Sequence, residues 1–302
     1  MLYELRHTTT YVYEGPVMHG RHLVRKRPRS SSYQTRKGFS LEVSPEPVWT
    51  AQQTDYFGNE TDLVEVLGSH DRLSVTARTR VEVGARPASL GLPLVKYGWE
   101  EAAELLERDR GNIESSEFRF DSPLVRRHGS LRKFAETTFT PGKPLLEGVL
   151  EFNERIFTEF TYDPNVTDVS TPLAQVLREK RGVCQDFAHV AVGALRSLGL
   201  AARYVSGYLE TSPPPGKEKL IGADASHAWA SVYIPSFGWL DFDPTNNVLP
   251  GERHIFLASG RDYSDVSPLK GVVHGGGRHV IQVGVDVAPV PAEGEPASRS
   301  AP

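Results

Sequence analysis

Apolar and polar positions alternate along the N-terminal part of the chain. The opening segment LYELRHTTTYVYEGPV has its large apolar residues mostly on one parity, and residues 72–83, RLSVTARTRVEV, repeat the pattern. A period of two is typical of strands with one buried face. Turn residues such as Gly15-Pro16 are expected to separate these strands. The pattern predicts an antiparallel β-domain with one solvated face.

From about residue 98 to 200 the apolar residues recur at three- and four-residue spacing, which predicts helices. Ser130 and Ser170 or Thr171 are candidate N-caps, and Pro172 suits a first helical turn. Gly199 is expected to end the last helix in a left-handed conformation. Strand patterns then return, in the segments ARYVSGYL, HAWASVYI, WLDF and HVIQVGVDV.

Helices that lead into an antiparallel sheet, after a β-rich region, predict an α+β protein. We expect an N-terminal antiparallel β-domain over residues 1–90 and an α+β core over 91–287. The Pro-, Ala-, Ser- and Glu-rich tail at 288–302 is predicted to be disordered. Residues 211–219, TSPPPGKEK, are predicted to form a loop because proline donates no ladder hydrogen bond.

Composition narrows the function classes. The 302 residues include 34 Lys and Arg against 38 Asp and Glu, a formal net charge of −4. This balance opposes a protein that binds nucleic acid mainly by neutralising phosphates, although the basic run HGRHLVRKRPRS leaves that alternative open. No apolar stretch reaches the roughly 18 residues of a membrane helix, and the N-terminus has no signal-peptide core. We expect a cytoplasmic protein that binds neither nucleic acid nor membrane.

The chain has one cysteine, Cys184, which excludes an internal disulfide, a Cys-rich zinc site and a CxxC redox pair. An apolar stripe at helical spacing follows it, so Cys184 is predicted to lie in the first turn of a buried helix. Free N–H groups and the helix dipole stabilise a thiolate at such a position. Two interpretations stay open, a small buried hydrophobe and a nucleophile.

A nucleophilic thiol needs a base, and the base needs an orienting group. His227 opens the strand HAWASVYI, which turns through PSFG into WLDFDPT. A tight turn centred on Pro235 would place Asp243 opposite His227, whereas a turn centred one residue later would place Thr245 there. Asp241 has the same parity as Asp243 and is the competing carboxylate.

The other histidines give weaker signals. His189 follows the cysteine on the same helix but points away from it, and we interpret it as a core or surface imidazole. His19 with His22, and His274 with His279, have spacings seen in metal pairs, but no thiol or carboxylate stands beside them in the sequence. No metal and no cofactor are predicted.

The segments GVCQDFAHVAVGALRSLGLAARYVSGYL, DASHAWASVYI and GWLDFDPTNN together resemble the core of the transglutaminase-like superfamily. The resemblance implies a papain-like α+β core with the nucleophile at a helix N-terminus packed on an antiparallel sheet. It also implies Cys184 as nucleophile, His227 as general base and acid, and Asp243, in preference to Asp241, as the orienting carboxylate. HTTTYVYEGPV, DYFGNETDLVEV and GRDYSDVSPLKGVVHGGG resemble the bacterial branch that carries a β-rich N-terminal domain.

The resemblance further implies a thiol-dependent enzyme that acts on carboxamide or peptide bonds of a protein or peptide through a thioester. Cysteine protease, amidase and acyltransferase are all compatible with it. The Cys184 N–H is the expected first donor to the oxyanion, and Gln185 and Trp229 are candidates for the second. We interpret Asp186 as structural. A non-catalytic binding module on the same fold is the alternative.

Overall fold

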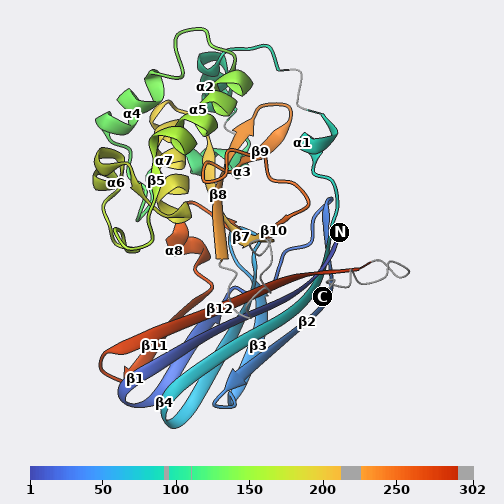
Figure 1. Ribbon diagram of the computed structural model, residues 1–302, viewed down its shortest axis with the longest axis vertical. Helices are drawn as coiled ribbons and strands as arrows, with labels where there is room; N and C mark the ends of the chain where they lie inside the picture. The colour runs from blue at the N-terminus through green and yellow to red at the C-terminus, as the bar shows by residue number, and fades with distance from the viewer. Residues whose placement is uncertain (92–94, 110, 212–225, 292–302) are drawn as a thin grey trace, which may run out of the picture.

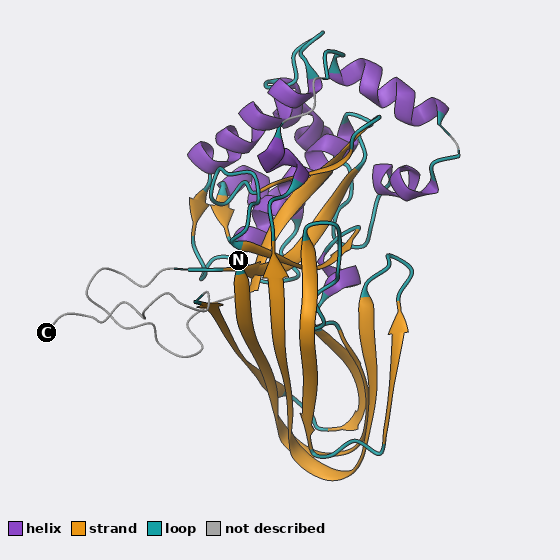
Figure 2. Cartoon of the chain, turned by 90° about the vertical axis from the view of Figure 1, so that its right-hand side faces the viewer, coloured by secondary structure: helices purple, strands orange, loops and turns teal. Residues whose placement is uncertain are grey.

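The computed structural model describes residues 1–302 except 92–94, 110, 212–225 and 292–302. The chain builds a long, strongly curved sheet, and a second unit of helices and strands packs at one end of it (Figures 1 and 2). The expected mixed α+β class, with an N-terminal antiparallel sheet, is confirmed. The predicted loop at 211–219 lies largely outside the described residues.

Two long strands, β1 (Leu2–Val24) and β4 (Glu60–Val83), pair antiparallel at the centre of the large sheet. Beside β4 lie β2 (Gln34–Ser44) and β3 (Trp49–Thr54). The break expected at Gly15-Pro16 is wrong, because β1 continues through it and the register only shifts between Val12 and Val17. A local irregularity of this kind bends a strand without ending it.

The last two strands return to the first sheet. Both β11 (Leu269–Gly275) and β12 (His279–Val290) pair antiparallel with β1. Both strands fall within the range 91–287 that was expected to belong to the core, but they pair with β1 of the N-terminal sheet. Residues 288–290 of the predicted tail belong to β12, and 292–302 lie outside the described residues. The N-terminal sheet is therefore made of strands from both ends of the chain.

The core has a four-stranded antiparallel sheet in the order β10-β7-β8-β9, with helices packed against it (Figure 1). Its helix α7 contacts β7, β8, α4, α5 and α6, so it lies at the centre of the core. The larger elements are α2 (Trp99–Arg108), α4 (Gly129–Glu136), α5 (Leu145–Glu159), α6 (Leu173–Glu179), α7 (Cys184–Ser197), β7 (Ala202–Leu209), β8 (Ser226–Ile234), β9 (Gly238–Phe242) and β10 (His254–Gly260). The short ones are α1 (Pro87–Leu90), α3 (Ile113–Ser116), η1 (Glu117–Arg119), β5 (Thr161–Tyr162), β6 (Arg181–Gly182) and α8 (Tyr263–Val266).

Helix ends agree with the sequence at some positions and differ at others. Gly199 follows α7 with φ of +89°, the left-handed conformation expected of it. The expected cap of α6 is wrong, because its N-cap is Pro172 itself and neither Ser170 nor Thr171. Ser130 is not a cap: α4 begins one residue earlier, and the N-cap is His128, whose ring nitrogen Nδ1 accepts from the Ser130 N–H. In the part of the chain that the structure describes, no helix is long and apolar enough to cross a lipid bilayer.

Buried amide side chains join the N-terminal sheet to strand β10. Gln34 donates from Nε2 to the Phe256 carbonyl at 2.7 Å and accepts the Phe256 N–H at 2.8 Å. Asn59 makes the same pair of bonds with Ser259, at 2.8 and 2.9 Å. Each amide side chain thus bonds the backbone N–H and carbonyl of one β10 residue, as a neighbouring strand would. A shared apolar cluster, which includes Tyr3 of β1, reinforces the contact.

Candidate functional site

Cys184 is the first residue of α7, as expected, and the start of that helix is held by Asp186. The Asp186 Oδ2 atom accepts the Val183 N–H at 2.8 Å and the Thr167 hydroxyl at 2.7 Å. Burial raises the pKa of Asp186 in spite of these bonds. A Cβ on Gly182 would lie 2.5 Å from Asp186 Oδ2, so the turn into the helix needs glycine. The contacts of Asp186 agree with the structural role expected for it.

The Cys184 side chain is half-buried and packs against an apolar cluster that includes Tyr204 and Ala188. Because Cys184 opens the helix, the N–H groups of the first turn have no partner within α7. These groups carry the positive end of the helix dipole and favour an anion beside them. The start of α7 is therefore a place where an anion is stabilised, and the Cys184 side chain beside it is only half-buried.

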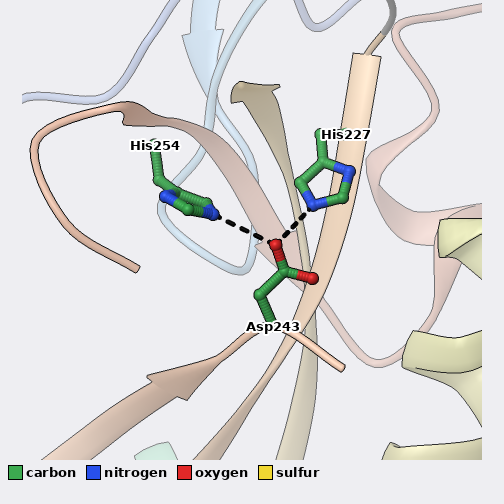
Figure 3. Close-up of side chains that lie close together, drawn as sticks. All are labelled: His227, Asp243 and His254. Atoms are coloured by element: carbon green, nitrogen blue, oxygen red, sulfur yellow. Dashed lines mark hydrogen bonds and ion pairs between the residues drawn. The ribbon is translucent and has the colours of Figure 1, made fainter. Parts of the chain in front are cut away.

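His227 lies on β8 and is 9% exposed. Its Nε2 atom is 2.7 Å from Asp243 Oδ2, and its second ring nitrogen points away from that carboxylate (Figure 3). Burial disfavours the charged imidazole, but the hydrogen bond with Asp243 and the nearby Cys184 outweigh it and raise the pKa of His227 to about 10. His227 thus interacts with the thiol and with the carboxylate.

Asp243 reaches His227 by a different route from the one that the turn argument proposed. The β8–β9 ladder pairs Ile234 with Gly238, so the turn is centred on Ser236 and not on Pro235. Strand β9 ends at Phe242, and Asp243 then leaves the ladder and bridges to Val248. The prediction of directly opposed residues is wrong, and the bend after β9 is what brings the carboxylate to the imidazole.

Asp241, the competing carboxylate, is already paired. It lies opposite Ser231 in the ladder and forms an ion pair with Arg86, a residue just beyond β4. Both side chains of the pair are buried, at 4% exposure for Arg86 and 10% for Asp241. No contact between Asp241 and His227 occurs among the described residues.

Asp243 is fully buried and accepts hydrogen bonds on both oxygens. Thr245 N–H bonds Oδ1 at 2.9 Å, while Oδ2 accepts from Asn246 Nδ2 at 2.7 Å and from His254 Nε2 at 3.1 Å, besides His227. Burial alone would raise the pKa of Asp243, but the hydrogen bonds from His227 and His254 hold it well below its usual range. Sequence reasoning missed Asn246 and His254; only Asn246 stands close to Asp243 in the sequence.

The ligand atoms of His227, Asp243 and His254 lie within 4.8 Å of one another (Figure 3). Two histidines and one carboxylate form a set that can hold a divalent metal. Here, however, both imidazoles bond the same oxygen, Oδ2, so the three groups satisfy one another directly. The two histidine pairs with metal-like spacing, His19 with His22 and His274 with His279, belong to no such cluster among the described residues. His19 instead bonds Glu65 at 2.7 Å.

The remaining candidates have structural contacts. Trp229 is fully buried, and its Nε1 has no hydrogen-bond partner among the residues described, so it does not face solvent as an oxyanion donor would. Gln185 is half-buried beside Cys184. His189 accepts the Tyr263 N–H at 3.1 Å, and burial lowers its pKa to about 4, which agrees with a neutral core histidine.

Comparison with known proteins defines the class of the fold and the site. The profile of the transglutaminase-like superfamily matches residues 132–244, and that of the bacterial transglutaminase-like N-terminal region matches residues 3–82. The core thus has the fold of a family of thiol enzymes. The chain belongs to the transglutaminase-like superfamily, in the branch with the bacterial N-terminal region.

Relatives cover nearly the whole chain. An uncharacterized protein of Mycobacterium tuberculosis is 40% identical over 97% of this chain and 94% of its own length. A crystal structure of a proposed cysteine protease from Cytophaga hutchinsonii superposes with a TM-score of 0.74 at 20% identity, over 98% of this chain and 93% of that one. A protein-glutamine gamma-glutamyltransferase of Pseudomonas aeruginosa is 32% identical over 39% of this chain and 18% of its own length.

Proposed function

We propose that this protein is a thiol enzyme that cleaves or exchanges carboxamide or peptide bonds, with Cys184 as nucleophile, His227 as general base and acid, and Asp243 as the orienting carboxylate. The observation that carries the proposal is the placement of His227, which bonds Asp243 through Nε2 at 2.7 Å and interacts with Cys184. Nucleophile, base and orienting group in this order are the minimal set for acyl transfer.

The chemistry follows from these positions. The Cys184 thiolate attacks the substrate carbonyl carbon, and the backbone N–H at the start of α7 donates to the oxyanion. The His227 imidazolium gives its proton to the departing nitrogen, the carbon–nitrogen bond breaks, and an acyl thioester remains on Cys184. His227 then takes a proton from water or from an amine as it attacks the thioester. The acid or the new amide leaves, and the thiolate–imidazolium pair is restored.

Protein or peptide carboxamides are the proposed substrates. The partial likeness to a protein-glutamine gamma-glutamyltransferase supports a glutamine side chain as acyl donor and a primary amine as one acceptor. Water in place of the amine would make the same site an amidase, and a main-chain peptide bond would make it a protease. All three reactions use one thioester, so they differ only in the donor bond and in the acceptor.

A glutamine-containing peptide library, incubated with the protein with and without a primary amine, tests the proposal by mass spectrometry. Chain cleavage identifies a protease, amine incorporation a transglutaminase, and the mass change of deamidation an amidase. Cys184→Ala is expected to abolish every one of these products. Turnover that survives in Cys184→Ala would contradict the proposed function. No product with a broad library, although the peptides bind, would favour the non-catalytic binding module.

A further inference from the structure

A second histidine lies on the carboxylate that orients His227. His254, the first residue of β10, bonds Asp243 Oδ2 through Nε2 at 3.1 Å, from the side away from His227 (Figure 3). It is 5% exposed, so it is not placed to touch a substrate. The proposed reaction does not use it, and its position needs a physical explanation.

The imidazole of His254 donates this bond. A buried carboxylate has acceptors only, so the proton between the two groups must reside on His254 Nε2. Burial lowers the pKa of His254 below its ordinary value, which agrees with a neutral ring. A neutral donor satisfies Asp243 without placing a second positive charge beside His227.

Two contacts, besides the bond to Asp243, hold His254 in place. Its ring meets Trp229 edge-on, with centroids 5.5 Å apart and planes at 87°. Its carbonyl accepts from the Arg86 guanidinium at 2.9 Å, and Arg86 is itself fixed by the ion pair with Asp241. The donor on Asp243 is therefore held by β8, by β9 and by the residue that leads out of β4.

A carboxylate with a single partner can turn about its Cβ–Cγ bond and exchange its oxygens. Asp243 cannot do so freely, because Thr245 N–H holds Oδ1 while His254 and Asn246 hold Oδ2. The lone pair that faces His227 then has one direction. Since Nε2 of His227 is fixed by that lone pair, the opposite ring nitrogen is kept directed away from Asp243 (Figure 3), and Cys184 is close enough to raise the pKa of the ring.

We propose that His254 is a positioning residue for the thiol reaction, which acts through Asp243 by fixing the carboxylate against His227. The assignment rests on the proposed function. Strand β10 would then help to position the reacting groups, because it carries His254. The N-terminal sheet holds this strand through Gln34 and Asn59. Mutation of a residue that hydrogen-bonds a metal-bound histidine typically changes activity by about 10- to 100-fold, and we expect an effect of similar size here.

The test compares His254→Leu, which removes the donor, with His254→Gln, which keeps an N–H donor at a similar reach. We expect His254→Leu to lower kcat by about 10- to 100-fold with KM unchanged, and to slow iodoacetamide labelling of Cys184 in parallel. His254→Gln is expected to recover most of both. His22→Leu is the matched control: it removes another buried histidine, in the N-terminal sheet, and should leave kcat and labelling unchanged.

The outcomes separate the two proposals. If Cys184→Ala abolishes turnover while a folded His254→Leu keeps wild-type kcat and labelling, the positioning role is contradicted and the proposed function stands. If Cys184→Ala retains turnover, the proposed function fails whatever His254 does. Should His254→Leu not fold, His254→Phe, which keeps an aromatic ring against Trp229 but has no donor, takes its place. A loss of kcat and labelling that His254→Gln restores supports the assignment, and wild-type kcat and labelling contradict it.

Discussion

At the scale of single residues, one buried carboxylate organises the site. Asp243 accepts from two imidazoles that respond in opposite directions: the pKa of His227 is raised and that of His254 is lowered. Burial lowers both pKa values, but Asp243 and the nearby Cys184 together raise that of His227, whereas the charge of His227 itself lowers that of His254. The site thus holds one charged and one neutral histidine on the same oxygen.

The raised pKa of His227 predicts a pH-dependent stability. Because the folded value of about 10 exceeds the ordinary 6.5, protonated His227 stabilises the fold fully below about pH 6.5, and this contribution is lost as pH rises through about 10. We expect the free energy of unfolding to fall over this window, and His227→Gln to reduce that fall by about 1 kcal/mol or more. Urea unfolding at several pH values measures both. An equal fall in the variant would contradict the assignment.

The predicted site residues and His254, one of the two residues that were missed, differ in how local their signals are. The placement of Cys184 at a helix start follows from apolar spacing over a few turns, and His227 and Asp243 stand in two segments joined by one short turn. His254 comes from β10, whose place beside β7 depends on a long-range pairing that no local pattern encodes. The sequence left two turn centres open, of which the later one occurs, and the bend at Asp243 decided the geometry.

At the scale of elements, strand β7 has a glycine, Gly207, at the one position where its neighbours leave no room for a side chain. Gly207 lies opposite His227 in the β7–β8 ladder and beside Phe256 of β10. A Cβ on Gly207 would be 2.2 Å from the Ile255 carbonyl oxygen and 2.4 Å from the Trp229 ring. The indole therefore covers the glycine and supports both histidines, whose rings lie 6.1 Å and 5.5 Å from it between centroids.

Gly207→Ala is expected to push Trp229 and β10 away from β7. Overpacking of this kind costs about 1–3 kcal/mol of folding free energy, and the shift of β10 should also lower kcat. Thermal melting and turnover measure the two effects. Gly15→Ala is the matched control, since a Cβ there meets nothing within 4 Å. Equal melting temperatures for the two variants would show that the close approach is not needed.

The strand patterns were easier to predict than their partners. Alternation identified the segment that became β12, but it could not tell which sheet the strand joins, because period-two burial looks the same in either. The pairing of β12 with β1 is settled by contacts of Val285 and Val287 with Tyr3 and Leu5 in one apolar cluster.

At the scale of the whole molecule, the N-terminal sheet and the core share buried polar contacts. Gln34 and Asn59 bond β10, and Arg86 bonds Asp241 and the His254 carbonyl. These contacts fix strand β10, which begins with His254, and the sheet therefore contributes to the geometry of the site. Unfolding of the sheet alone would leave several buried polar groups of the core unpaired, which favours a single cooperative transition.

Arg86→Met tests this coupling. It leaves Asp241 buried without its cation, and we expect a loss of about 3–5 kcal/mol in folding free energy. The double variant with Asp241→Asn should regain part of that loss, because the uncompensated charge is gone. Arg132→Met, which breaks an exposed ion pair with Glu136, should cost less than about 1 kcal/mol. Equal losses of folding free energy in Arg86→Met and Arg132→Met would show that the contact between the N-terminal sheet and the core does not stabilise the fold as proposed.

The central claim is that Cys184 and His227 form a reactive thiolate–imidazolium pair held by Asp243. The rate of iodoacetamide labelling of Cys184, measured from about pH 5 to about pH 9, tests it without knowledge of the substrate. We predict labelling at about pH 6 that is at least about tenfold faster than for a free cysteine, and a collapse of this excess in His227→Ala. A rate that tracks a free thiol across the range, unchanged in His227→Ala, would contradict the account.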